Sequence, residues 1–136
     1  MTVRENYDIV AKAAEFSRDF EVEPKMDVLH TLLDKTIEFL NEEVHETKTA
    51  IAASDDAEII DGFGDVAFIA LNGIYKHFRI SGNSHEDSCS AVTEVMRRIC
   101  EANLGKKQPD GTIKYVSGKV QKPEGWRAPA YDDMVV

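Results

Sequence analysis

One segment constrains the fold more than any other, because residues 57–79 have the pattern of a helix that is apolar around most of its circumference. Apolar side chains recur at helical spacing on nearly every side of this segment: Ile59, Ile60, Phe63, Val66, Ala67, Ala70, Leu71, Ile74 and Phe78. A helix of this kind is normally buried in the protein interior. We therefore expect other elements of the chain to cover it.

Three further segments are predicted to be helical because their apolar residues also recur at helical spacing. They cover about residues 7–20, 25–53 and 84–103. The expected core face of the second of these helices is an apolar stripe made of Leu29, Leu33, Ile37, Leu40 and Val44. Ser54, Asp55 and Asp56 interrupt the pattern and are suited to capping the helix that follows.

The character of the chain changes after Gly105. Residues 106–136 contain Pro-Asp-Gly and Ser-Gly sequences that favour turns, and residues 112–122 favour a small hairpin. The sequence therefore predicts an all-α fold, with a four- to five-helix bundle over residues 1–105. Residues 106–136 are expected to form an irregular C-terminal arm of the same domain.

Composition and charge limit the partners of the chain. Its 136 residues include 16 basic and 25 acidic side chains, a formal net charge of −9, which argues against binding to nucleic-acid phosphates. The longest apolar run, Val66 to Leu71, is far shorter than the roughly 20 residues needed to cross a bilayer. We expect a reduced cytoplasmic protein with no nucleic-acid or membrane partner. A polyphosphate ligand would need a divalent cation to approach so acidic a chain.

Two acidic strips are the main candidates for chemistry. In Glu42-Glu43-x-x-Glu46 three carboxylates point across one margin of the apolar stripe, a pattern that on its own is typical of a solvated surface helix. On the apolar helix over residues 57–79, Asp61, Asp65 and Asn72 fall within about 40° of one another. Buried carboxylates are costly unless they are paired or bound to a metal.

Two interpretations of these strips remain open. In the first, Asp61 and Asp65 pair with Lys or Arg from neighbouring helices. In the second, the two strips face each other and form a carboxylate cluster that needs a cation. Ligands that are all oxygen favour Mg²⁺ or Mn²⁺. No histidine or cysteine lies at ligand spacing with these acids, so zinc is not expected.

Taken together, the two motifs resemble those of the all-α nucleoside triphosphate pyrophosphohydrolases. This superfamily includes the MazG-like enzymes, the dimeric dUTPases and the phosphoribosyl-ATP pyrophosphohydrolases. The family's E-x-x-E helix is similar to FLNEEVHETKTAI, and its E-x-x-D motif with the apolar helix after it is similar to EIIDGFGDVAFIALN. The arm of small phage-type and bacterial MazG-like proteins looks similar to EVMRRICEANLGKKQPDGTIKYVSGKVQKPEGWRAP.

The resemblance implies a Mg²⁺ site, with Mn²⁺ as a possible substitute. Carried over by position, Glu43, Glu46 and Asp65 would be metal ligands. Glu42 would be a further ligand or the base that activates water, so Glu42, Glu43 and Glu46 are the expected catalytic carboxylates. The expected substrate-binding residues are Asn72, Lys76, Asn103 and Lys106.

One position departs from the family pattern. Gly62 stands three residues before Asp65, where the family usually has a glutamate. Asp61, one position earlier on the same face, would then replace the glutamate as a metal ligand. We expect a Gly62→Glu substitution to raise activity if the motif is merely damaged.

The implied reaction is hydrolysis between the α- and β-phosphates of a nucleoside triphosphate, giving a monophosphate and pyrophosphate, as in house-cleaning of nucleotide pools. The family's sites lie between protomers, so a homodimer or homotetramer is expected. Two alternatives stay open: a phosphoribosyl-ATP pyrophosphohydrolase, and a catalytically weak nucleotide-binding helical bundle.

The aromatic residues are expected to serve packing rather than base recognition. Trp126 either pins the arm to the bundle or stacks on a base, and we favour pinning. Phe68 and Tyr75 are expected in core or oligomer contacts.

Overall fold

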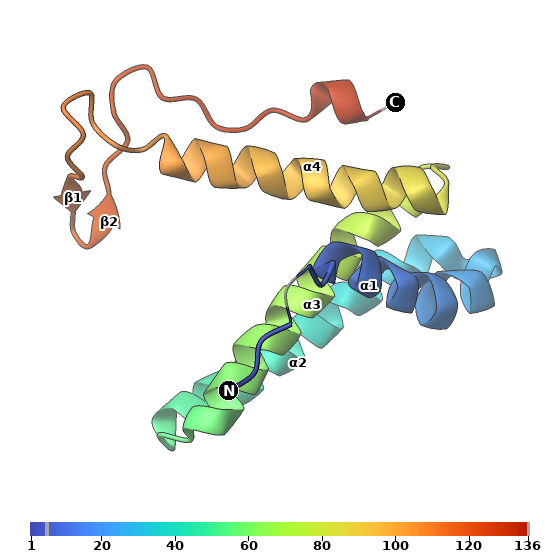
Figure 1. The fold of residues 1–136 in the computed structure, drawn as a ribbon. Helices are drawn as coiled ribbons and strands as arrows, with labels where there is room; N and C mark the ends of the chain where they lie inside the picture. The colour runs from blue at the N-terminus through green and yellow to red at the C-terminus, as the bar shows by residue number, and fades with distance from the viewer. Residues whose placement is uncertain (5, 136) are drawn as a thin grey trace. The chain divides into compact units, whose positions relative to one another are not determined.

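The computed structural model describes residues 1–4 and 6–135, which are mostly helical (Figure 1). The helices are α1 (Ile9–Phe16), α2 (Leu32–Ala52), α3 (Asp56–Ile80) and α4 (His85–Leu104). The predicted all-α class is confirmed. A four- to five-helix bundle is not supported, because among the described residues only α2, α3 and α4 are long, with 21, 25 and 20 residues, while α1 has 8.

The chain divides into two compact units, residues 1–92 and 93–136, with the boundary inside α4. The expectation that residues 1–105 and 106–136 belong to one domain stays a prediction.

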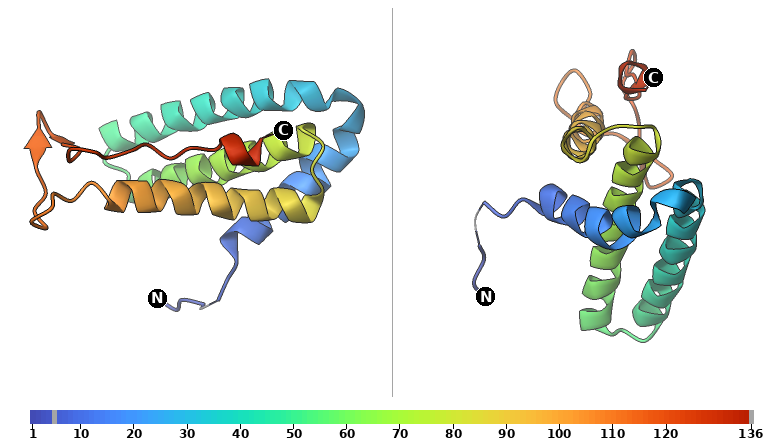
Figure 2. Two further views of the ribbon diagram at one scale, coloured as in Figure 1. Left: turned by 90° about the horizontal axis from the view of Figure 1, so that it is seen from above. Right: turned by 90° about the vertical axis from the view of Figure 1, so that its right-hand side faces the viewer.

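Helices α2 and α3 form an antiparallel pair in the first unit (Figure 2). The turn between them forms where the sequence predicts it. Ser54 adopts a φ of 54°, and the Asp55 side chain accepts a hydrogen bond of 3.3 Å from the Glu58 N–H, which caps α3. Acidic residues in the first turn of α3 and basic residues in its last turn complement the helix dipole.

The predicted start of the second helix is wrong. Helix α2 begins at Leu32, and Glu23–Thr31 instead form 3₁₀ turns whose backbone leaves helical values at Lys25 and Val28, with φ of −128° and −125°. Pro24 contributes to this break, because it has no N–H to donate to a preceding turn and fits best at the start of a new helical stretch.

The first helix is shorter than predicted. Helix α1 begins after Asp8, whose side chain accepts a 2.9 Å hydrogen bond from the Ala11 N–H, and it ends at Phe16. The chain continues through Ser17–Val22 in wider, π-type turns. These turns bring Val22 into the protein interior, where it is fully buried.

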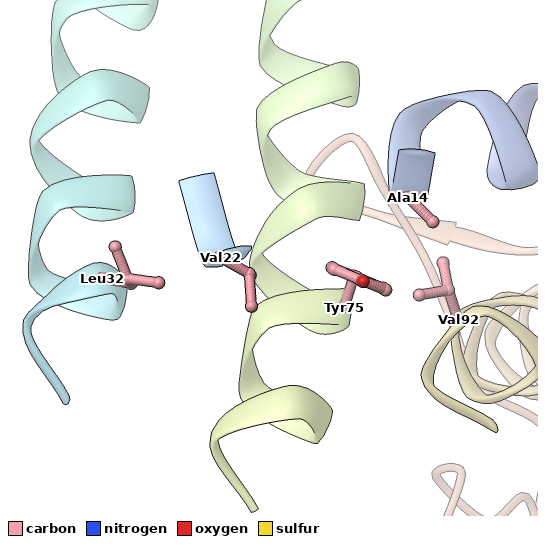
Figure 3. Packing of buried hydrophobic residues seen from close by; sticks show 5 residues of the cluster. All are labelled: Ala14, Val22, Leu32, Tyr75 and Val92. Atoms are coloured by element: carbon pink, nitrogen blue, oxygen red, sulfur yellow. The ribbon is translucent and has the colours of Figure 1, made fainter. Parts of the chain in front are cut away.

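The core of the first unit is small. It lies where α3 meets α1, the first turns of α4 and the wound segment after α1 (Figure 3). Its buried members are Ala14, Val22, Leu32, Tyr75 and Val92. Tyr75 is therefore a core residue, as expected. Its hydroxyl lies 2.8 Å from His85 Nδ1 and accepts a 2.8 Å hydrogen bond from Arg79.

The predicted core face of α2 is not the face that is buried. The buried residues of α2 are Leu32, Thr36, Thr47 and Ala50, whereas Ile37 of the expected stripe is 55% exposed. Helix α3 is likewise not covered on all sides, since Ile60 is 74% exposed and Phe63 is also exposed. The expectation of an all-round burial for residues 57–79 is thus wrong for these positions.

The second unit contains the later turns of α4 and the C-terminal arm. The predicted hairpin is present: β1 (Tyr115–Val116) pairs antiparallel with β2 (Lys119–Val120). The last part of the arm runs back along α4 (Figure 1), where Arg98 donates to the Ala130 carbonyl at 2.8 Å. Trp126 Nε1 donates to the Ala102 carbonyl at 2.7 Å, so Trp126 pins the arm to α4, as favoured from the sequence.

Candidate functional site

The two acidic strips lie on α2 and α3, which pack closely at two glycines of α3. A Cβ atom at Gly62 would lie 2.1 Å from Thr47 Oγ1, and one at Gly73 would lie 3.3 Å from Thr36 Cγ2. The Thr47 hydroxyl turns back to donate a 2.6 Å hydrogen bond to the Glu43 carbonyl. Small residues on α3 opposite threonines on α2 therefore let the two backbones approach one another.

This close packing brings carboxylates of α2 and α3 together. We call the group Glu42, Glu43, Glu46, Asp61 and Asp65 the acidic flank. Burial, and then repulsion from Glu46, Asp65, Asp61 and Glu42, raises the pKa of Glu43 above its usual value of 4.5.

Asp65 is perturbed in the same direction. Burial, and then the neighbouring Asp61, raises the pKa of Asp65 above its usual value of 3.8, and Glu46 adds to the effect. Contact with Asp61 raises the pKa of Asp65, whereas contact with Glu43 lowers it. Among the described residues, no carboxylate of the acidic flank forms an ion pair with lysine or arginine. The interpretation in which Asp61 and Asp65 pair with basic neighbours is therefore not what the structure contains.

A pocket of about 270 Å³ opens beside the acidic flank. It brings together four of the predicted site residues, Glu43, Asp65, Asn72 and Lys76. Its other walls are mainly apolar and aromatic: Phe16, Phe39, Phe68 and Ile69, with Glu21. Phe68 thus lines the pocket, which its expected packing role did not anticipate.

The remaining flank residues lie near the pocket or next to it. Glu46 lines a neighbouring hollow of about 310 Å³ together with Asp55 and Glu58. Glu42 and Asp61 are exposed and act on Glu43 through their charge. The carboxylates of the acidic flank therefore spread along the α2–α3 groove instead of surrounding a single point.

Asn72 and Lys76 are both almost completely buried, with 2% and 1% of their surface exposed. Lys76 Nζ donates a 2.7 Å hydrogen bond to Glu21, whose other oxygen accepts one of 2.8 Å from Ser17. The charge of Lys76 is therefore already balanced. By contrast, Asn72 Oδ1 is buried and has no hydrogen-bond partner among the described residues.

The acidic flank is chemically suited to a hard divalent cation. Within residues 1–4 and 6–135, no group of three or more His, Cys, Asp or Glu side chains converges closely enough to hold a metal ion. Magnesium, however, usually uses only one or two protein carboxylates and completes its shell with waters and substrate phosphates. Glu43 and Asp65, two neighbouring carboxylates with raised pKa values, fit that requirement.

The expectation for Gly62 needs correction. A Cβ at this position would overlap the Thr47 side chain, so a glutamate requires a shift of Thr47 or of the two helices. Gly62 is a packing residue that faces Thr47 of α2. A Gly62→Glu variant is therefore expected to lose stability, and it does not test whether the acidic motif is damaged.

Asn103 and Lys106 belong to the second unit. Lys106 Nζ donates a 2.7 Å hydrogen bond to Asn103 Oδ1 and lies 5.4 Å from the centre of the Trp126 ring. The two residues also line a pocket of about 270 Å³ with Tyr115 and Val120 of the hairpin. Asn103 and Lys106 are therefore hydrogen-bonded to each other, as two residues of one site would be. Their role in binding substrate stays a prediction.

Sequence reasoning missed four residues of the pocket beside Asn72, which are Phe16, Glu21, Phe39 and Ile69. Phe39 lies four residues before Glu43, on the same side of α2, so the helical spacing that placed the acids could have found it. Phe16 is the last residue of α1, within a segment that the sequence predicts to be helical. Glu21 lies in the π-type turns of Ser17–Val22, for which the α-helical pattern gives no signal.

In the comparisons with known proteins, no family model, no curated protein and no solved structure matches this chain. Over the described part of the chain, no helix has the length and apolar character needed to span a membrane.

Proposed function

We propose that this protein hydrolyses nucleoside triphosphates to a nucleoside monophosphate and pyrophosphate, with Mg²⁺ as its cofactor and the acidic flank as its catalytic centre. The observation that carries the proposal is the pair Glu43 and Asp65. Burial, and then the charge of acidic neighbours, raises the pKa of both carboxyl groups. Both residues line one pocket with Asn72. Carboxylates in such a setting gain most from a bound cation.

The positions of the acidic-flank residues support separate roles in cation binding and proton transfer. Glu43 and Asp65 would hold the cation at the mouth of the pocket, with Asp61 and Glu46 as nearby oxygen donors. When bound, Mg²⁺ supplies charge neutralisation for the phosphates and lowers the pKa of water. A carboxylate that does not hold the cation would take the proton from the attacking water, and Glu42 is the candidate for this base. The water oxygen would bond to Pα as the bond between Pα and the bridging oxygen breaks, and pyrophosphate would leave.

We further propose that the chain works as a homo-oligomer in the cytoplasm. The side of the α2–α3 pair away from the acidic flank exposes a stripe of apolar residues at helical spacing: Ile37, Val44 and Ile51 on α2, and Ile60 and Phe63 on α3. We call these five residues the apolar flank. Exposed apolar residues at helical spacing suit a protein interface, and a second copy of the same helix pair would complete a four-helix arrangement.

The oligomer proposal is tested by light scattering after gel filtration. We expect a dimer or tetramer for the native chain and a smaller species for Phe63→Glu. Gly64→Ala, next to Phe63 on the same helix, should leave the mass unchanged. A native chain that is monomeric at high concentration would contradict this part of the proposal.

A nucleotide-binding bundle without turnover is the second candidate. It is favoured by the finding that, within the described residues, no three of the carboxylates converge on one point.

Pyrophosphate release separates the two candidates. We would incubate the protein with a panel of nucleoside triphosphates, including modified ones and phosphoribosyl-ATP, with Mg²⁺ or with EDTA. Release that needs Mg²⁺ and yields a monophosphate is the expected result, and a strong preference for phosphoribosyl-ATP would assign the narrower activity. Nucleotide binding with no release from any member of the panel would favour the binding bundle.

A further inference from the structure

The sequence predicts Lys76 as a substrate-binding residue, but the structure buries its side chain. The side chain is 2% exposed, and Nζ donates a 2.7 Å hydrogen bond to Glu21, which lies 55 residues earlier in the chain. The other oxygen of Glu21 accepts a 2.8 Å hydrogen bond from Ser17, which is completely buried. These three side chains therefore connect α3 to the π-type turns that follow α1.

The ion pair between Lys76 and Glu21 differs from the others in the chain. Among the ion pairs of the described residues, no other has both side chains less than one-fifth exposed. Replacing a buried pair by uncharged side chains of similar volume is often neutral for stability, whereas removing one partner leaves an unpaired charge. The pair does specify one arrangement, because two donors must reach the same carboxylate.

The segment held by this network supplies part of the pocket beside Asn72. Phe16, directly before Ser17, lines the pocket together with Glu21. Turns of the π type are rare and usually short, so Ser17–Val22 depends on contacts outside itself. The acidic flank is held differently, by the packing of α3 against α2 at Gly62.

From these observations we infer that Lys76 is a positioning residue, which acts through Glu21 and contacts neither substrate nor metal. The pair holds the Ser17–Val22 turns against α3 and thereby fixes Phe16 in the pocket wall. The inference rests on the proposed function, since the pocket belongs to the proposed site. It assigns Lys76 a different role from the substrate contact that the sequence predicts.

Hydrogen–deuterium exchange tests the positioning without any need for activity. Lys76→Met removes the ammonium group at similar volume and leaves the Glu21 carboxylate without its cation. Exchange over residues 9–22 should become at least about tenfold faster, while α2 keeps its native rates. Lys35→Met is the matched control, because it removes the cation of an exposed pair with Glu38, and it should leave residues 9–22 unchanged.

A double variant separates positioning from substrate contact. Lys76→Met combined with Glu21→Gln removes both charges and keeps an oxygen acceptor for Ser17. It should restore native exchange over residues 9–22, and it should melt above Lys76→Met, because no buried charge is left unpaired.

Steady-state hydrolysis of the best nucleoside triphosphate gives the second readout. Lys76→Met should raise KM by about tenfold, the effect of losing one apolar wall contact. Its kcat should change little, because the acidic flank does not depend on Ser17–Val22. The double variant should return KM to near the native value. A lysine that bound substrate could not be rescued in this way, since the double variant also lacks the ammonium group.

Two results would overturn the inference. One is unchanged exchange over residues 9–22 in Lys76→Met. The other is a double variant with native exchange and a raised KM, which would assign Lys76 to substrate binding. If Lys76→Met does not fold, the double variant decides between a native KM, which supports the inference, and a raised KM with native exchange, which contradicts it.

Failure of the inference is separable from failure of the proposed function. If the native chain releases no pyrophosphate, the hydrolase proposal fails, and exchange still shows whether Lys76 positions residues 9–22. If pyrophosphate is released but exchange in Lys76→Met is unchanged, only the positioning role fails.

Discussion

Glu94 in α4 and Glu43 in α2 are glutamates on long helices of the same chain, yet their surroundings are opposite. Glu94 accepts hydrogen bonds from Arg97 and Arg98, and these contacts lower its pKa to about 2. Arg98 also binds Asp133 at 2.7 Å and lowers the pKa of that carboxyl group. Glu43 has acidic neighbours instead, and its pKa is raised.

The difference shows how a structural carboxylate can be told from a functional candidate. Glu94 pairs with arginines inside α4, and Asp133 joins the C-terminal arm to α4 through Arg98, so the charge of both acids is used by the fold itself. The acids of the acidic flank repel one another, which the fold tolerates without gaining from it. Groups with raised pKa values in a pocket are candidates for function.

The largest expected effect is on activity. Replacing Glu43 by Gln should lower pyrophosphate release by about 10²–10⁴-fold, the usual cost of losing a catalytic proton acceptor or an essential ligand. Circular dichroism should show an intact fold. Glu94→Gln is the matched control and should keep the activity. Equal losses of activity in both variants would contradict the distinction between a structural Glu94 and a catalytic Glu43.

The next effect is on stability in the presence of metal. Added Mg²⁺ should stabilise the native chain by about 2.7 kcal/mol at a concentration 100 times its dissociation constant. Thermal unfolding with Mg²⁺ or EDTA measures the shift, with Glu94→Gln behaving as the native chain and Glu43→Gln responding weakly. A melting temperature that does not change with Mg²⁺, with and without nucleotide, would count against a cation at the acidic flank.

A pair of glycine variants sharpens the comparison by testing how the acids are brought together. Gly62→Ala should destabilise the chain by about 1–3 kcal/mol, because its Cβ would overlap Thr47. Gly64→Ala, two residues along the same helix with nothing within 4 Å of its Cβ, should stabilise it by about 0.5–1 kcal/mol. Chemical denaturation measures both, and equal effects would mean that α2 and α3 are not packed this closely.

The smallest expected effect is on the pH dependence of stability. Folding raises the pKa of Glu43, so its ionised form destabilises the native state at neutral pH. Glu43→Gln should therefore melt slightly above the native chain at pH 7, and this difference should disappear as the pH falls towards 4.5.

Glu94 has the opposite sign. Its lowered pKa means that its stabilising contribution is present above pH 4.5 and is lost between there and about pH 2. Glu94→Gln should melt below the native chain at pH 7, and its deficit should vanish over that lower range. Differences of the same sign for the two variants at pH 7 would contradict the electrostatic contrast.

Helical periodicity was sufficient to predict α3 and α4, the capped turn at Asp55 and the hairpin around Ser117-Gly118, because each depends on local sequence. It was not sufficient for Glu23–Thr31, where 3₁₀ turns replaced a predicted α-helix. It also assigned Ile37 to the core, since an apolar stripe does not say whether its partner is in the same chain.

The candidate site was partly predictable for the same reason. Spacing placed Glu43, Asp65 and Asn72 on adjoining faces, but the pocket also needs Phe16 and Glu21 from the segment before α2. The role of Gly62 depended on a contact with Thr47 in another helix, which no local pattern contains.

Mn²⁺ binding, measured by electron paramagnetic resonance, tests most directly whether the acidic flank is a cation site. Mn²⁺ prefers the same oxygen ligands as Mg²⁺, and the signal of the free ion falls when it binds. The native chain and Glu94→Gln should bind Mn²⁺ alike, and Glu43→Gln should lose most of this binding. Equal binding by all three proteins, or none by the native chain, would contradict the assignment of the acidic flank as a metal-dependent catalytic centre.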